Sequence, residues 1–299
     1  MIDAGSHSTC EDGNGNASVD TVKKTFSWIL PLMLPAAVLA SAAESREAAA
    51  ASARLTADQI ITRAVELADR LHEQEHDLRY EFLEQAIREK FDPAGRTKEH
   101  EEVTAKVYPL AGALYREVVE KNGHPLSSKE IEGERRRRDE VRRRRVRGEK
   151  KEEEDRVRFS RELLDCYRAK LAGVQPINGR PTYVVRFEPK SDSLPVRRRI
   201  DYALNKSHGR IFVDKETFQV ARIEFQLIEP VRLWWGVLGK LRAVKGVIER
   251  APLADGSWVG RGFDFSMNMR IFFRNIHTRR RATFRDHRLA ELEPSESGS

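Results

Sequence analysis

The spacing of apolar residues changes once along the chain, and this change sets the fold class. From Ile60 to Leu71 apolar side chains recur every three or four residues, the period of one amphipathic helix, and Thr56 can cap its start. From Tyr80 onwards apolar and polar side chains alternate, as they do in half-buried β-strands. The sequence therefore predicts an α+β fold in which one helix precedes an antiparallel sheet.

Predicted strands fill most of the remaining chain. They cover residues 80–90, 97–108, 114–121, 169–176, 182–189, 211–214, 218–229, 241–250, 258–274 and 279–288. Turn sequences separate neighbouring strands at residues 92–95 and at Asn178-Gly179. The last strand is rich in arginine, and we expect it at an edge of the sheet, where positive charge discourages pairing with a further strand.

Residues 127–160 interrupt these strands. From Glu134 to Arg158 the chain has 13 basic and 8 acidic residues and almost no apolar ones, so this segment predicts a solvated helix with pairs of opposite charge four residues apart. The runs Arg135–Arg138 and Arg142–Arg145 could neutralise phosphates. Acidic residues interleave with them, however, and aromatic residues are missing, so we expect no nucleic-acid partner. Attraction to anionic lipid headgroups or to an acidic partner is the role we favour for these arginines.

The N-terminal region has the features of a secretory signal peptide. Lys23 and Lys24 precede an apolar run at residues 26–39, and the small residues Ala40-Ser41-Ala42 follow it. We therefore predict a mis-assigned extension at residues 1–21, a signal peptide at 22–43 and a soluble periplasmic product. A linker at 44–54, one domain at 55–290 and a disordered tail at 291–299 complete the predicted organisation.

No motif in the chain makes a strong case for catalysis. The glycine-rich nucleotide fingerprints and the Gly-x-Ser-x-Gly hydrolase motif are missing, and two cysteines are too few for a four-cysteine zinc site. His72, Glu73 and His76 match H-E-x-x-H, in which two histidines on one helix hold zinc and the glutamate acts as base. The match lies at the polar end of the predicted helix, so a zinc metalloprotease is a remote alternative. We expect no enzyme, metal or cofactor.

One strand carries an apolar stripe. Phe263, Phe265, Met267, Met269 and Ile271, followed by Phe273, fall on the same face of the predicted strand 258–274. From the sequence alone the simplest interpretation is core beneath the helix, but methionine and aromatic side chains repack readily and can also hold a flexible apolar ligand. Trp234 and Trp235 form a second apolar cluster, which could be a buried corner or an exposed lid.

Several segments resemble the LolA/LolB/RseB-like periplasmic family, most closely its outer-membrane lipoprotein-sorting proteins. They are residues 115–130 (YREVVEKNGHPLSSKE), 178–190 (NGRPTYVVRFEPK), 209–227 (GRIFVDKETFQVARIEFQL) and the aromatic stretch 233–238. The resemblance implies a strongly curved, unclosed half-barrel, capped by helices, with an apolar cavity for acyl chains. It implies a periplasmic carrier of lipidated proteins, lipids or other hydrophobic ligands, or alternatively an RseB-like envelope-stress sensor.

The resemblance and the apolar pattern together define a candidate ligand site and partners. The candidate residues are Phe225, Leu227, Trp234, Trp235, Phe263, Phe265, Met267, Met269 and Ile271. We expect a monomer that binds a lipoprotein or lipid ligand and meets a membrane-protein partner transiently.

Overall fold

The computed structural model describes residues 55–149, 159, 165–191, 194, 196, 201–233 and 239–291. The predicted signal peptide, the predicted linker and the Trp234-Trp235 cluster lie outside the described residues, as do part of the charged insertion and nearly all of the predicted tail. In the described part of the chain, no helix is long and apolar enough to cross a membrane.

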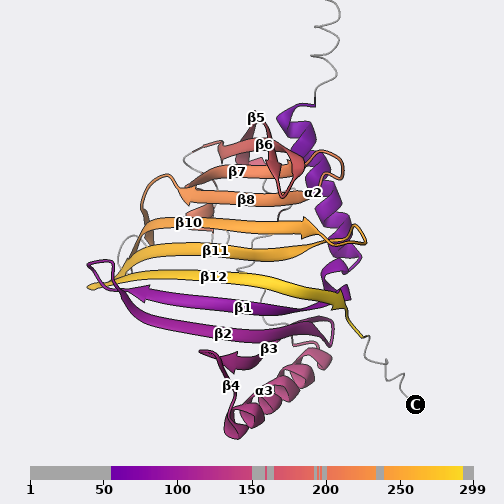
Figure 1. Cartoon of the computed structure of the whole chain (residues 1–299). Coiled ribbons are helices and arrows are strands. Elements are labelled where there is room, and N and C mark those ends of the chain that lie inside the picture. Colours follow the sequence, from indigo (N-terminus) through magenta and orange to yellow (C-terminus); the bar gives the residue numbers. More distant parts are fainter. Residues whose placement is uncertain are drawn as a thin grey trace, which may run out of the picture. The chain divides into compact units, whose positions relative to one another are not determined.

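The described chain forms one large antiparallel sheet with few helices (Figure 1), which confirms the predicted α+β class. The helices are α2 (Ala57–Glu73), the 3-10 helix η1 (His76–Arg79), α3 (Ser128–Val146) and α5 (Asp201–Leu204). The strands are β1 (Tyr80–Phe91), β2 (Thr97–Leu110), β3 (Ala113–Lys121), β4 (His124–Pro125), β5 (Tyr167–Ile177), β6 (Arg180–Pro189), β7 (Ser207–Asp214), β8 (Val220–Leu227), β9 (Val231–Leu233), β10 (Gly239–Pro252), β11 (Trp258–Ile271) and β12 (Arg274–Leu289).

The strand order is β4-β3-β2-β1-β12-β11-β10-β8-β7-β6-β5, and β9 pairs with β10. The last strand of the chain thus pairs with the first, which joins two runs of sequential hairpins into one sheet. The sheet is open, which confirms the predicted unclosed arrangement. It is not strongly curled, so the prediction of a strongly curved half-barrel was wrong. Alternation in the sequence determines which face a side chain joins, whereas bending depends on twist and bulges that the pattern does not encode.

The arginine-rich strand β12 is not the edge strand that we predicted. It lies in the middle of the sheet, between β1 and β11. Carboxylates on these neighbours accommodate its charge: Arg281 Nη2 lies 3.3 Å from Glu89 Oε2 on β1, and Arg279 pairs with Asp264 on β11. The composition of one strand does not reveal the opposite charges on the strands that it will pair with.

The long strand predicted at residues 258–274 is in fact two strands and a turn. β11 ends at Ile271, the chain turns at Phe272-Phe273, and β12 begins at Arg274, which pairs with Ile271. The expected face position of Phe273 was therefore wrong, and its side chain is 92% exposed. Glycine and asparagine, which usually mark such turns, do not occupy this one, so the sequence held no signal for it.

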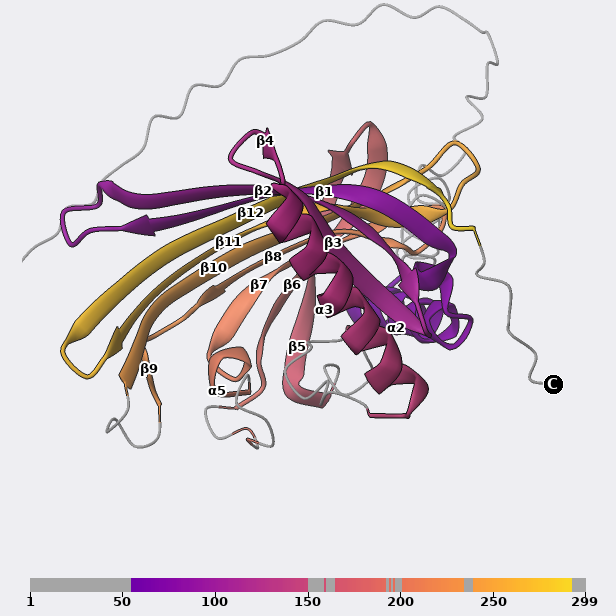
Figure 2. The ribbon, with the colours of Figure 1, turned by 90° about the horizontal axis from the view of Figure 1, so that it is seen from below.

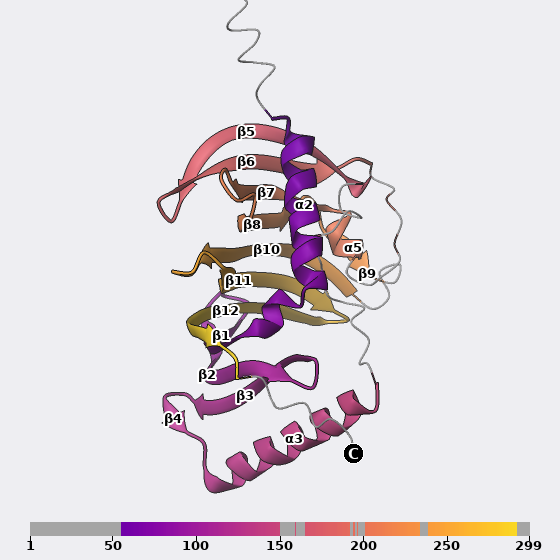
Figure 3. The same cartoon turned by 90° about the vertical axis from the view of Figure 1, so that its right-hand side faces the viewer.

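Helix α2 begins where the sequence predicts. The Thr56 side chain accepts a hydrogen bond from the backbone N–H of Gln59 at 3.2 Å, and Gln59 Oε1 accepts one from the Thr56 N–H at 2.9 Å. This reciprocal capping box satisfies two backbone donors that the first turn would otherwise leave open. The helix then runs across the strands on one face of the sheet (Figure 3).

Helix α3 makes up most of the described part of the charged insertion, and none of its side chains is buried. Phe159, near the end of the insertion, packs against a core cluster beneath α2. Helix α3 lies along β3 near one edge of the sheet (Figure 2). Arg145 donates to the carbonyl oxygens of Leu110, Ala113 and Leu114 at 2.8–3.0 Å, and Arg137 donates to that of Arg116 at 2.6 Å. The helix is thus solvated, as predicted, and its arginines also cover the backbone of a strand near an open edge, which protects that edge against pairing with another chain.

A buried ion pair holds the turn between β7 and β8. The Asp214 side chain is 1% exposed, and its Oδ2 accepts a hydrogen bond from Arg180 Nε at 2.7 Å. It also accepts hydrogen bonds from the backbone N–H and the hydroxyl of Thr217, both at 2.9 Å. Burial by itself would raise the pKa of the Asp214 carboxyl, but these hydrogen bonds outweigh burial and hold its pKa below the usual range.

Asp214→Ala should lower the free energy of unfolding at neutral pH by about 3 kcal/mol, because it leaves Arg180 and the turn N–H groups without their shared acceptor. The measurement is urea-induced unfolding. Glu216→Ala is the matched control: Glu216 binds the same arginine at 2.8 Å but is 79% exposed, so we expect a loss of less than about 1 kcal/mol. Equal losses for the two variants would contradict the structural role of Asp214.

Candidate functional site

Helix α2 covers only part of one face of the sheet, which we call the α2 face. Its buried residues pack against β6, β7 and β8 in one core cluster, formed by Ala57, Ile60, Ile61, Ala64, Val65, Val185, Ile211, Val213 and Val220. The helix lies at one end of the strands, where it runs from β5 past β10 (Figures 1 and 3). Away from this end, the α2 face has no helix of comparable length above it among the described residues.

Strand register places a row of side chains across this face. Partners in register project from the same face because side chains alternate along each strand. The row runs through β7, β8, β10, β11 and β12 and consists of Gly209, Phe225, Gly246, Phe265 and Arg280. It belongs to the α2 face because Ile223, two residues before Phe225, packs against the cluster beneath α2.

The glycines in this row make room for phenylalanine rings. A Cβ atom at Gly246 would lie 2.3 Å from Cζ of Phe225, and one at Gly209 would lie 2.7 Å from Cζ of Phe187. Both distances are well below van der Waals contact, so each ring lies directly over the backbone of a neighbouring strand. The Phe225 and Phe265 rings follow each other at a centroid distance of 6.3 Å. The result is a continuous apolar surface of rings and bare backbone.

The predicted stripe lies beside the helix-covered cluster and forms a second one. Val231, Leu241 and Val244 are its buried members. Five predicted ligand residues pack against them while keeping part of their surface open: Phe225, Leu227, Phe265, Met267 and Met269. The prediction of core beneath the helix was therefore wrong for these residues, because the α2 residues belong to the other cluster.

The two other described candidates, Phe263 and Ile271, are half-buried on β11. The Phe263 ring meets that of Phe284 on β12 at a centroid distance of 6.1 Å. Trp234 and Trp235 lie outside the described residues.

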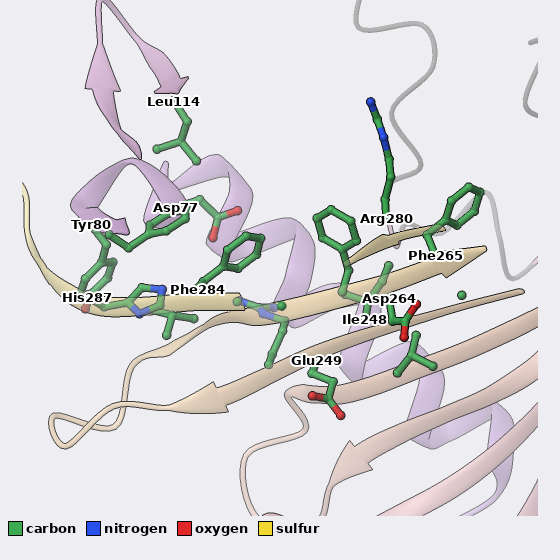
Figure 4. A pocket seen from close by; sticks show the side chains of 18 of the residues that line it. Asp77, Tyr80, Leu114, Ile248, Glu249, Asp264, Phe265, Arg280, Phe284 and His287 are labelled. Atoms are coloured by element: carbon green, nitrogen blue, oxygen red, sulfur yellow. The ribbon is translucent and has the colours of Figure 1, made fainter. Parts of the chain in front are cut away.

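A cavity of about 670 Å³ opens on the α2 face beside η1 (Figure 4). Tyr80, Phe82 and Phe284 line one part of it, and Phe225, Ile248, Phe263 and Phe265 line another. Ile248 is 44% exposed although it lies in the middle of a wide sheet. An exposed isoleucine and partly open aromatic rings around one hollow are typical of a site for an apolar ligand.

The cavity has a charged side. Arg280 lines it and also lines a neighbouring hollow of about 390 Å³. The nearby charges are matched: Arg88 lies 3.8 Å from Glu101, and Arg116 donates to Glu84 at 2.7 Å. Arg280 is exposed and makes no ion pair or side-chain hydrogen bond with another described residue. In Figure 4 its side chain rises from the sheet beside Phe265. The apolar row thus ends at an uncompensated positive charge.

Sequence reasoning missed Tyr80, Phe82, Ile248, Arg280 and Phe284. The alternation of residues places each on a strand face, but it does not state which strands become neighbours. β12 was expected at an edge, and its pairing with β1 is what brings Tyr80 and Phe82 to Phe284. No local signal in the sequence encodes that pairing.

The H-E-x-x-H segment does not form the arrangement that zinc proteases use. His72 and Glu73 are exposed in the last turn of α2, which ends at Glu73. Glu75 has a left-handed backbone conformation with φ of 49°, and His76 is buried in η1 against Tyr80, with ring centroids 5.5 Å apart. The two histidines therefore do not share one helix face. Among the described residues, no group of three potential ligands could hold a metal ion.

Two histidines near the cavity have a buried Nδ1 atom with no hydrogen-bond partner among the described residues. They are His76, which is buried, and His287, which is half-buried, lines the cavity and stacks on Phe82 with ring centroids 4.9 Å apart. Burial lowers the pKa of both imidazoles, and for His287 the neighbouring Arg261 adds to this effect. The fold therefore favours the neutral form of both rings.

We expect the melting temperature to fall as the pH is lowered from about 7.5 to about 5.5. The imidazoles of the unfolded chain, with a pKa near 6.5, take up protons before the folded ones do, so protonation stabilises the unfolded state. The double variant His76→Gln/His287→Gln should lose less stability over this range in thermal unfolding monitored by circular dichroism. His72→Gln, at an exposed position, should behave like the unchanged protein. A pH dependence that survives the double substitution would contradict the assignment.

No family model matches the sequence, and no curated protein matches it. Several solved structures match the structure of this chain. A LolA superfamily protein, NE2245 from Nitrosomonas europaea, is 11% identical with a TM-score of 0.30, over 82% of this chain and 99% of that one. A putative outer membrane lipoprotein-sorting protein domain from Vibrio parahaemolyticus is 10% identical with a TM-score of 0.31, over 79% of this chain and 95% of that one.

A complex of MucA and MucB from Pseudomonas aeruginosa also matches, at 11% identity and a TM-score of 0.24, over 79% of this chain and 99% of that one. At these identities and TM-scores the likenesses transfer no ligand and no partner. The chain is thus similar to structures of the LolA superfamily and to MucB, and the resemblance found in the sequence is confirmed to that extent.

Proposed function

We propose that this protein binds an acyl chain, carried by a lipid or a lipidated protein, on the α2 face. The observation that carries the proposal is the open apolar row of Phe225, Gly246 and Phe265 beside a cavity lined by Tyr80 and Phe284. These side chains lie where α2 does not cover the sheet. An apolar surface left open on a folded protein usually serves a ligand or a partner.

The size and chemistry of the cavity suit a long, flexible and apolar ligand. Its volume of about 670 Å³ lies within the range of small-molecule sites, roughly 300–1,000 Å³. Met267 and Met269 lie beside the row and can adopt several conformations at low cost, so the surface can adjust to chains of different shape. The rings of Phe225 and Phe265 offer flat apolar area without polar atoms.

Arg280 defines the polar end of the proposed ligand. Its guanidinium is exposed, lies next to Phe265 in register and has no carboxylate partner among the described residues. An amphiphile whose chain lies on the aromatic row would place a carboxylate or phosphate headgroup near this cation. Arginine binds both groups through paired hydrogen bonds. This arrangement favours an acidic lipid as the ligand.

With the predicted signal peptide, such a site would serve a periplasmic carrier of the lipoprotein-sorting type. The envelope-stress sensor remains the alternative, since it would use the same site and differ in whether the ligand is passed on. We propose the carrier because an open surface releases a ligand more readily than an enclosed cavity does. The non-enzymatic assignment fits a cavity whose lining is mainly apolar and in which no group of metal ligands is found among the described residues.

Ile248→Glu should weaken binding of a fluorescent palmitoyl probe at least about tenfold, because it places a carboxylate among the apolar contacts of the chain. Ile248 is 44% exposed, so the variant should still fold. Ser266→Glu is the matched control: it lies on β11 next to Phe265 but points to the other face, where its register partner is Arg279. Fluorescence titration gives both affinities.

Unchanged binding in a folded Ile248→Glu variant would exclude the α2 face as the acyl site. Native mass spectrometry of the purified full chain, before and after mild organic extraction, provides an independent check. A lipid or acyl-peptide mass that disappears on extraction is expected.

Arg280→Gln should weaken the binding of palmitate about fivefold, the equivalent of roughly 1 kcal/mol for an exposed ion pair. The same substitution should leave methyl palmitate unaffected, because the ester has no charge. Competition against the palmitoyl probe measures both ligands. Arg285→Gln, an exposed arginine on the same strand, is the control. Equal effects of Arg280→Gln on acid and ester would show that the headgroup lies elsewhere.

A further inference from the structure

The turn between β11 and β12 exposes two phenylalanines, Phe272 and Phe273, which we call the Phe-Phe turn. Phe272 is 59% exposed and Phe273 is 92% exposed. The turn projects at the end of the sheet away from α2 (Figures 1 and 2). Phenylalanine has no polar atom that water can bind, so exposing two of them at the tip of a hairpin is unfavourable for a protein that meets only water.

The backbone of the turn makes the choice of residues more unusual. Ile271 and Arg274 pair directly, so Phe272 and Phe273 form the whole connection between the strands. Phe272 has φ of 49°, in the left-handed region that favours glycine and asparagine. A sequence that served only the hairpin would have one of these residues there. Local rules of this kind are broken most often at functional sites, which suggests that the rings themselves are needed.

Basic residues surround the Phe-Phe turn. Arg270 and Arg274 flank it in sequence, and Lys240 is the register partner of Arg270 on β10, with Arg232 next to it on β9. All four are exposed, and none makes an ion pair with another described residue. The segments 231–233, 239–243 and 268–277, which form this end of β9 to β12, contain neither aspartate nor glutamate.

The carboxylates that approach this end from other elements are occupied. Asp92, in the turn after β1, pairs with Arg96 at 2.8 Å, and Glu229 pairs with Lys206 at 2.8 Å. Glu99 on β2 pairs with Lys90 at 2.5 Å. The positive charge around the Phe-Phe turn is therefore not neutralised within the described part of the chain.

We propose that the Phe-Phe turn is a membrane-docking element that inserts its two rings into a bilayer containing anionic lipid. The rings would enter the boundary between headgroups and acyl chains, where aromatic side chains are favoured. The surrounding lysine and arginines would contact the anionic headgroups, each of which attracts a nearby cation. Two exposed phenylalanine rings surrounded by basic side chains fit a lipid surface better than an acidic protein. Binding to an acidic protein through the basic side chains would leave the two rings in water.

This inference does not depend on the acyl-binding proposal, but the two would work together. The Phe-Phe turn directly follows the stretch of β11 that carries Met267 and Met269. Docking at the turn would bring the Met269 end of the apolar stripe on β11 close to the bilayer, and an acyl chain could then move between membrane and protein over a short path.

The test is co-sedimentation of the full chain with vesicles of phosphatidylcholine alone and with vesicles that also contain phosphatidylglycerol. We expect binding to the anionic vesicles. Phe272→Ser/Phe273→Ser should weaken it at least about tenfold, since two rings lose their burial. Arg270→Gln/Arg274→Gln should weaken it by about fivefold for each charge removed and should reduce the preference for anionic lipid, to which Lys240 and Arg232 still contribute.

Two controls come from the opposite end of β12. Leu289→Ser removes an exposed apolar side chain, 62% exposed, and Arg285→Gln removes an exposed charge. Neither should change vesicle binding. Because residues 1–54 are the same in every variant, any affinity of that segment contributes equally to all of them. Melting temperatures near that of the unchanged protein would show that the variants fold.

A local probe makes the outcome decisive. In a Cys10→Ser/Cys166→Ser background, Phe273→Cys carrying an environment-sensitive fluorophore should brighten and shift to the blue when anionic vesicles are added, while Leu289→Cys with the same fluorophore should not. A fluorophore at position 273 that stays in water, or Phe272→Ser/Phe273→Ser binding like the unchanged protein, would overturn the proposal.

Discussion

A single helix has to cover a sheet that is wider than the helix is long. The 17 residues of α2 make it about 26 Å long, whereas eleven consecutive strands span roughly 48 Å from edge to edge. Helix α2 lies at one end of the strands (Figures 1 and 3), packs on side chains of β6, β7 and β8, and leaves the middle of the same face open. The cavity, the half-buried stripe on β11 and the exposed Ile248 are consequences of this mismatch.

The open part of the face remains compatible with folding because its side chains cover one another. Phe225 lies over the backbone at Gly246, and Phe263 packs against Phe284. These contacts bury enough of each ring to stabilise the sheet while one surface stays accessible. A sheet that used larger residues in place of Gly246 would lift the ring of Phe225 out of this layer, and the continuous apolar surface would be interrupted.

Cross-strand ion pairs balance part of the charge on the sheet. On the face away from α2, Arg210 pairs with Glu224 and Arg222 pairs with Glu249. Such cross-strand pairs keep a strongly basic chain compatible with close strand packing, although each exposed pair contributes little stability. Arg280 and the cations around the Phe-Phe turn stand outside this network. Arg280 lies beside the open apolar row, and the other cations surround the exposed rings of the Phe-Phe turn. Unpaired positive charge therefore lies next to exposed apolar surface at two separate positions.

The sequence by itself determined the opening helix with its Thr56 cap, most of the antiparallel strands, the solvated charged helix and the apolar stripe that includes Phe265 and Met267. Each of these depends on spacing or on local hydrogen bonds, which a sequence records directly. Only the tertiary structure decided that β12 pairs with β1, that α2 stops short of the stripe and that Phe272-Phe273 is a turn. The reason is physical: the period of two assigns a residue to a face, but strand neighbours are chosen by complementary surfaces far apart in the chain. Arg279 and Arg281 illustrate this, because their position at the centre of the sheet depends on Asp264 and Glu89, which belong to other strands.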